Sequence, residues 1–127
     1  MLDKKFWETI KYFRMSEFDS PDYPGSGFFM THSLVSTLNL VRTIIKLPIV
    51  INSGVRTVKH NKFVGGKDDS SHLTGDASDV HCPGDYFRFM FIDICLVQGI
   101  KRILIYKTFI HVDIDKKKPH PIIKYME

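Results

Sequence analysis

One segment near the end of the chain could place an imidazole beside carboxylates. Residues 109–115, FIHVDID, alternate apolar and polar side chains. Side chains of a strand point to opposite faces in turn, so the apolar members would pack on helices and the other face would carry His111, Asp113 and Asp115. A row of this kind can bind a metal or transfer protons, although a solvent-exposed strand face has the same pattern.

A second segment, SSHLTGDASDV at 70–80, adds another imidazole and another carboxylate. His72 and Asp79 are seven residues apart, which could place them on one face of a helix. Most of the residues between them are poor helix formers, Gly75 above all. We therefore expect His72 on a loop that turns at Gly75, and Asp79 on a strand with Val80 buried on the opposite face. An unrelated loop histidine and a capping aspartate are the alternative.

Taken together, His72, Asp79 and His111 provide the donor set of a catalytic metal site. Zinc accepts imidazole nitrogens and carboxylate oxygens, and three protein ligands leave a fourth position for water. A metal in such a site lowers the pKa of that water and polarises a carbonyl group, as peptide hydrolysis requires. The remaining histidines belong to no such set in the sequence and are expected at the surface or in structural hydrogen bonds: His32, His60, His81 and His120.

These residues must be positioned by a small mixed fold. The hydrophobic spacing and the breakers predict helices over 6–13, 33–47 and 86–98, strands over 48–54, 77–81, 102–107 and 109–115, and a polar, glycine-rich loop over 60–75. Ser33 is a plausible N-cap, and Pro48 ends the second helix. The last two strands are close enough for a hairpin. We expect an α+β fold with a small antiparallel sheet and helices packed on one side, in one domain spanning 1–127.

Charge and composition narrow the possible partners. The 127 residues carry a formal charge of +4, with a run of three lysines at 116–118. This favours an anionic partner, nucleic acid or a polymer such as the bacterial cell wall, unless the run is merely solvated. No helix-turn-helix pattern or aromatic-rich basic strand supports nucleic acid. Cys82 and Cys95 are expected to be free, packed thiols.

The apolar stretches are too short to span a membrane, and the N-terminus lacks the apolar core of a signal peptide. We expect a protein that is made in the cytoplasm and does not insert into membranes.

Four boxes in a fixed order carry a family resemblance. They are SGVRT at 53–57, HNKFVGG at 60–66, SSHLTGDASD at 70–79 and IYKTFIHVD at 105–113. Together they resemble the zinc D-Ala-D-Ala carboxypeptidases, which belong to the LAS-type metallopeptidases along with the VanX dipeptidases and related bacteriophage endolysins. The likeness runs from about Glu17 to Asp115. The first zinc box of the family is filled at every fixed position, by Ser70, His72, Gly75, Ala77 and Asp79.

The resemblance implies roles for individual residues. His72, Asp79 and His111 would hold Zn²⁺ in a fold like that of the LAS and Hedgehog domains. Arg56 would bind the substrate and help to stabilise the oxyanion, since charge develops on that oxygen during attack. Ser70 would lie near the substrate backbone.

One departure from the family pattern concerns the general acid/base. Many members have Glu or Asp three residues before the last zinc-binding histidine, and here that residue is Thr108. A branch of the family writes its last box as His-x-Asp, as this chain does. Asp113 is therefore the candidate base, with an orienting role behind the ligand or a surface position as alternatives; Asp115 is a weaker candidate.

The function implied is a zinc-dependent peptidase that hydrolyses stem peptides of bacterial peptidoglycan, as a D,D-carboxypeptidase or an endopeptidase. We expect a monomer that acts on the cell wall and serves a bacteriophage in lysis or entry, encoded by the phage or carried in its virion. The alternative is a protein of the same fold that binds zinc but has lost catalysis, as in the related Hedgehog signalling domains, and Thr108 is its main support.

Overall fold

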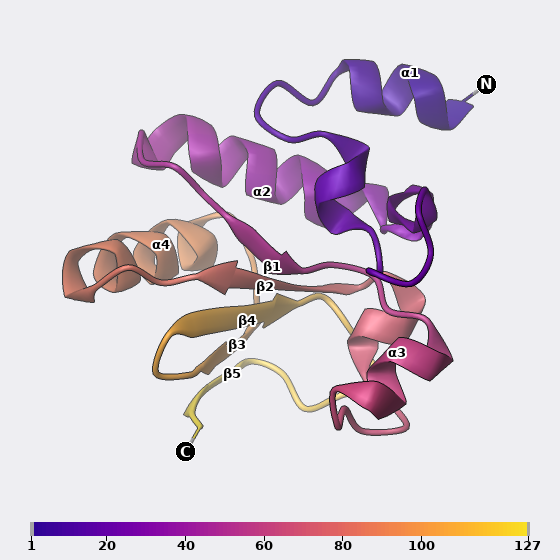
Figure 1. The fold of residues 1–127 in the computed structure, drawn as a ribbon. Helices are drawn as coiled ribbons and strands as arrows, with labels where there is room; N and C mark the ends of the chain where they lie inside the picture. The colour runs from indigo at the N-terminus through magenta and orange to yellow at the C-terminus, as the bar shows by residue number, and fades with distance from the viewer. Residues whose placement is uncertain (1, 127) are drawn as a thin grey trace.

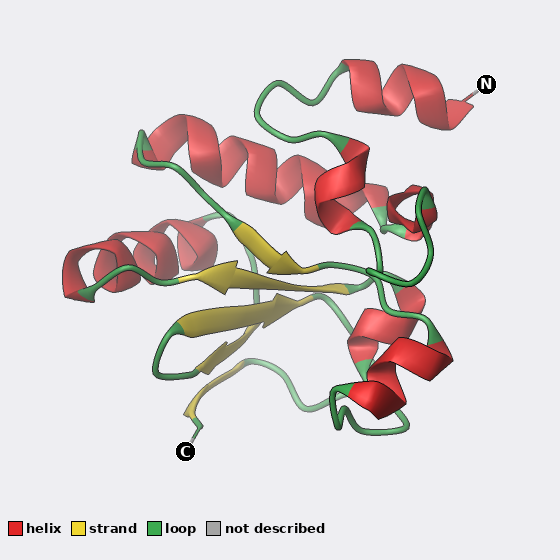
Figure 2. Cartoon of the chain, viewed as in Figure 1, coloured by secondary structure: helices red, strands yellow, loops and turns green. Residues whose placement is uncertain are grey.

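The computed structural model describes residues 2–126, with side chains from residue 4 onward. It is an α+β fold built on one five-stranded sheet, which confirms the expected fold class (Figures 1 and 2). The strands lie in the order β1-β2-β4-β3-β5, with β1 at Ile51–Ser53, β2 at Ala77–His81, β3 at Arg102–Ile105, β4 at Phe109–Asp113 and β5 at Ile122–Tyr125. The α-helices are α1 (Leu2–Glu8), α2 (His32–Ile45), α3 (Val58–Phe63) and α4 (Asp85–Val97).

The core lies between the sheet and the helices α2 and α4. Val80, Ile110 and Val112 are fully buried on the sheet face that meets these helices. Their strand neighbours of opposite parity, among them Asp79 and His111, face the other way. The alternation predicted for the last strand is therefore confirmed, and one face of the sheet is left available for polar side chains.

Strand register decides which polar side chains meet on that face. In the antiparallel pair β2–β4, Asp79 lies directly opposite His111. In the antiparallel pair β3–β4, Arg102 lies directly opposite Asp113. Because facing residues of antiparallel strands have their Cβ atoms about 5 Å apart, the register alone brings Asp79 next to His111 and Arg102 next to Asp113.

Two helix predictions need correction at their ends. The first helix was expected over 6–13 but ends at Glu8. The Thr9 hydroxyl donates to the Phe6 carbonyl, and the Tyr12 amide donates to the Asn39 side chain on α2 instead of continuing the helix. The second helix begins at His32, so Ser33 lies inside its first turn and Thr31 precedes it.

The segment expected as a loop over 60–75 contains helical structure. Helix α3 occupies Val58–Phe63, and its N-cap Thr57 accepts a hydrogen bond from the His60 amide at 3.0 Å. A short 3-10 helix follows at Ser71–Thr74. Both helices are short, and each begins at a residue whose side chain caps its N-terminus. Segments of four to six residues are too short to show a helical hydrophobic period in the sequence.

The sheet differs from the expectation at both edges. The strand expected over 48–54 is reduced to β1 at Ile51–Ser53. Strand β5 was not predicted, and it pairs parallel with β3, so the sheet is only mostly antiparallel. Its sequence IIKY is short and follows a lysine-rich turn, and its register depends on long-range hydrogen bonds.

The expectation for the two cysteines is confirmed within the described chain. Cys82 and Cys95 are free and buried, and burial raises the pKa of the Cys95 thiol. From residue 2 to residue 126, no helix is long and apolar enough to cross a membrane.

Candidate metal centre

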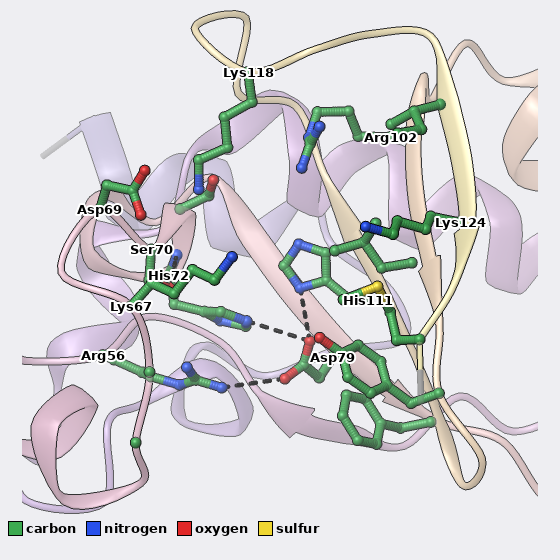
Figure 3. A pocket seen from close by; sticks show the side chains of 18 of the residues that line it. Arg56, Lys67, Asp69, Ser70, His72, Asp79, Arg102, His111, Lys118 and Lys124 are labelled. Atoms are coloured by element: carbon green, nitrogen blue, oxygen red, sulfur yellow. Dashed lines mark hydrogen bonds and ion pairs between the residues drawn. The ribbon is translucent and has the colours of Figure 1, made fainter.

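The structure brings together the three residues that the sequence assigned to a metal. One potential ligand atom from each of His72, Asp79 and His111 lies within 4.8 Å of the other two. Asp79 Oδ1 is 3.2 Å from His72 Nε2 and 2.9 Å from His111 Nδ1 (Figure 3). All three side chains are largely shielded from solvent. They form a compact set of two imidazoles and one carboxylate.

The backbone explains how residues seven and 32 positions from Asp79 reach the same point. His72 lies on the 3-10 helix Ser71–Thr74, where the Ser70 hydroxyl accepts from the His72 amide at 3.2 Å. The helix ends at Gly75, whose φ of +75° is a conformation that favours glycine. A Cβ there would also lie 2.1 Å from the Phe29 carbonyl oxygen. Gly75 thus turns the chain from His72 directly into β2.

The second nitrogen of each imidazole is already bonded. His72 Nδ1 lies 2.7 Å from the carbonyl oxygen of Gly54, and His111 Nε2 lies 2.8 Å from Asp113 Oδ2. Both partners are acceptors, so both nitrogens carry the proton. Metal-binding histidines are held in this way by a carbonyl or a carboxylate, which fixes the ring and its tautomer.

The donor set therefore fits a divalent metal ion. With the outer nitrogens protonated, His72 Nε2 and His111 Nδ1 turn their lone pairs toward an oxygen of Asp79. Three acceptors that face one another repel unless a cation lies among them. Nitrogen and carboxylate oxygen ligands in a group of three are those that zinc takes in sites with an open fourth position.

The pKa values of Asp79 and His111 also indicate that this site attracts positive charge. Burial acts to raise the pKa of Asp79, but hydrogen bonds from His111 and His72 outweigh it and hold that pKa well below its ordinary value. Burial acts to lower the pKa of His111, but its hydrogen bonds to Asp113 and Asp79 outweigh it and raise that pKa. Asp79 is thus ionised at neutral pH, and the opposite shifts of the two pKa values show that the site favours a positive charge beside this carboxylate.

Arg56 is fixed against the same carboxylate. Its Nη2 donates to Asp79 Oδ2 at 3.2 Å, which leaves Oδ1 to the two imidazoles (Figure 3). Its Nε donates to the Ser53 hydroxyl at 3.0 Å, and its Nη1 donates to Asn61 Oδ1 at 3.3 Å. Each terminal nitrogen retains a second N–H. Because the fork is planar and held at three points, those N–H groups have fixed directions.

Asn61 is a further residue of the site, and it supports Arg56. It is buried on α3, and its amide nitrogen donates to the Lys67 carbonyl at 2.8 Å. A Cβ at Gly66 would lie 2.1 Å from its Oδ1. The glycine in HNKFVGG therefore allows the loop to close over Asn61, which in turn holds Arg56.

Asp113 lies behind the imidazole of His111, on the side away from Asp79. It is only 1% exposed, and it accepts from His111 Nε2 and from the Asp115 amide at 3.1 Å. Arg102 Nε lies 2.9 Å and 3.1 Å from its two oxygens. A carboxylate engaged in this way fits the orienting role that the sequence left open for Asp113 better than the role of base.

We expect Asp113→Asn to weaken metal binding about 10- to 100-fold, the usual effect of losing a group that orients a metal ligand. The amide removes the charge that pairs with Arg102 and turns one of the two acceptor oxygens into a donor, so residue 113 can no longer accept from His111, Arg102 and the Asp115 amide together. Metal affinity is measured by competition with a chromophoric chelator. Asp93→Asn, a change of an exposed aspartate on α4, is the matched control and should bind like the wild type. Equal affinities for the two variants would rule out the orienting role.

A pocket of about 590 Å³ opens over the metal centre. Ser70, His72, Asp79, His111 and Arg56 all line it, so the predicted substrate-side residues do share one cavity. Its wall includes Tyr106 and Phe109, whose rings stack with centroids 4.2 Å apart. Burial, followed by the charge of Asp79, raises the pKa of the Tyr106 phenol, so that it remains a hydrogen-bond donor. Tyr106 had no role assigned from the sequence.

Thr108 lies outside the pocket. It is exposed in the turn between β3 and β4, and its carbonyl accepts from the Cys82 amide at 2.9 Å. Apart from Asp79, the acidic side chain among the described residues that line the pocket is Asp69, which is exposed at the rim.

Asp79 and His111 on the sheet and His72 on the 3-10 helix beside it meet in a pocket, with each imidazole held from behind, and this is the make-up of a metallohydrolase centre. Comparison with protein families identifies the class more closely. The family model described as Peptidase M15 matches residues 11–113. The chain belongs to the peptidase M15 family, whose members are metal-dependent. A search of curated proteins found no match. The family-level prediction from the four boxes is thus confirmed, and the matched segment contains all three candidate metal ligands.

Proposed function

We propose that this protein is a zinc-dependent peptidase that hydrolyses the stem peptides of bacterial peptidoglycan. One observation carries the proposal: in a chain of a peptidase family, two imidazole lone pairs and a carboxylate oxygen converge within 4.8 Å at a pocket large enough for a short peptide. Ligand pockets commonly have volumes of about 300–1,000 Å³. A D,D-carboxypeptidase and an endopeptidase both fit this description.

The residues of the chain divide the chemistry among them. His72, Asp79 and His111 would hold the zinc ion, which when bound supplies Lewis acidity and an activated water. Arg56 directs its remaining N–H groups toward the oxygen of the scissile carbonyl, where negative charge develops. Ser70 presents its hydroxyl to the substrate backbone, and the stacked rings of Tyr106 and Phe109 shield one side of the pocket from water.

The family resemblance and the net charge of the chain support a role at the bacterial cell wall. A formal charge of +4 favours contact with anionic wall polymers, at which the enzyme would act as a monomer. A role in bacteriophage lysis or entry, whether phage-encoded or carried in the virion, stays a prediction.

A second candidate is a zinc-binding protein of the same fold that does not catalyse. The observation in its favour concerns the two positions considered for the general acid/base. Residue 108 is a threonine and lies outside the pocket, and Asp113 is already bonded to Arg102 and His111. Such a protein would bind the metal and the peptide without turnover.

The deciding experiment is a digest of purified peptidoglycan with zinc-loaded protein and with protein stripped by a chelator, read by mass spectrometry. The peptidase predicts defined stem-peptide fragments that require zinc and return when zinc is restored. Tight zinc binding with no product from several wall types would overturn the peptidase and support the non-catalytic protein.

A further inference from the structure

The pocket over the metal centre has an excess of positive charge that the proposed chemistry does not use. Lys67, Lys118 and Lys124 line it, and Figure 3 shows their amines directed into the space above His72 and His111. None of the three forms an ion pair with a carboxylate in the described part of the chain, whereas Arg56 is paired with Asp79 and Arg102 with Asp113.

Two of these lysines come from a segment beyond the family match, which ends at residue 113. The pocket residues that this segment contributes are Lys118, Pro119, Ile122, Lys124 and Met126. In Figure 2 it runs as a loop from β4 and returns to the sheet as β5. The segment forms one wall of the pocket, and Lys67 lies on the glycine-rich loop across from it.

The C-terminal wall is held in place by hydrogen bonds. Arg102 Nη1 donates to the Pro119 carbonyl at 2.6 Å, and the Ile122 amide donates to the Lys101 carbonyl at 2.8 Å. Beyond them, β5 pairs with β3 over four residues. The same Arg102 binds Asp113 behind His111, so the wall and the metal centre share one anchor. The backbone positions of Lys118 and Lys124 are thereby fixed relative to the site.

Three lysine amines outnumber the one rim carboxylate, Asp69, in this concave surface, and they concentrate positive potential because protein walls of low dielectric focus the field into the cavity. The ligand that this potential selects must be negatively charged. Within a peptide, that charge resides on free carboxylates, and an ammonium group binds a carboxylate as a compact point charge.

Building on the proposed peptidase function, we propose that Lys67, Lys118 and Lys124 form a carboxylate-recognition site. It makes the enzyme specific for acidic peptides that carry free carboxylates beside the scissile bond. The lysines act on substrate selection, and the metal centre acts on the bond.

The test uses two peptides of one sequence, the first with free side-chain and terminal carboxylates and the second with those groups amidated. We expect the wild-type protein to cleave and to bind the acidic peptide about 10- to 100-fold better, since three partly exposed ion pairs each contribute modestly. The combined variant Lys67→Gln, Lys118→Gln, Lys124→Gln should reduce this preference to within about twofold. Its zinc content and unfolding temperature should not change.

The matched control removes the same charge elsewhere, by Lys4→Gln, Lys5→Gln and Lys11→Gln near the N-terminus, and should keep the full preference. Binding is measured by calorimetry, independently of turnover. Selective binding without cleavage would refute the peptidase but leave the recognition site standing. A wild-type protein without preference in either assay, or a control that loses the preference equally, would overturn the recognition site.

Discussion

Replacing His72 by alanine should abolish metal binding and peptidase activity together. The variant removes one of three ligands and leaves Asp79 with a single imidazole partner. A set of two ligands does not hold zinc in the geometry that catalytic sites need. We expect no zinc retained after dialysis, measured by atomic emission, and no fragments from peptidoglycan by mass spectrometry.

The control must separate metal loss from misfolding, because His72 is 97% shielded and its ring donates to the Gly54 carbonyl. His81→Ala changes an exposed histidine two residues from Asp79 on the same strand, and it should retain zinc and activity. Circular dichroism should show both variants folded. A folded His72→Ala protein that digests cell wall at the wild-type rate would refute the metal mechanism.

The metal set could be predicted from the sequence because short-range patterns determine it. The alternation in FIHVDID places His111 on the polar face of a strand, and the glycine in SSHLTGDASD indicates the turn that aligns His72 with Asp79. The strand register, which places Asp79 directly opposite His111, is the consequence of burying Val80 and Ile110 on the other face.

The surroundings of the metal set could not be predicted in the same way. The Arg102–Asp113 pair depends on the β3–β4 register, and the role of Asn61 depends on a loop that closes at Gly66. Strand β5 forms because Lys101 and Ile105 offer backbone partners far from it in the chain. Such contacts between distant segments leave no periodic signal in a single sequence.

The residues around the candidate ligands divide into two groups. The first group holds the ligands from behind: the Gly54 carbonyl supports His72, and Asp113 supports His111. The second group faces the substrate, and it includes Arg56, which binds Asp79 Oδ2 and still has free N–H groups. The strongest test of this division is therefore a variant that changes a residue of the second group and leaves the first group intact.

Arg56→Lys is that variant. Lysine keeps the positive charge beside Asp79 but cannot bind Ser53, Asn61 and Asp79 at once, because it has no planar fork. We expect kcat to fall about 10²–10³-fold, the usual loss for one donor to a developing oxyanion. Zinc affinity should change far less, since all three ligands remain. Steady-state kinetics on a stem peptide and chelator competition measure the two quantities.

The comparison variant is Arg88→Lys on α4, where the arginine pairs with the exposed Asp85 away from the pocket. Arg88 does not line the pocket, so both kcat and zinc affinity should match the wild type. If Arg56→Lys lost zinc affinity in proportion to its rate, Arg56 would serve only to hold Asp79. A large loss of rate at nearly unchanged zinc affinity assigns it to the substrate, because the metal ligands alone would then be insufficient for turnover.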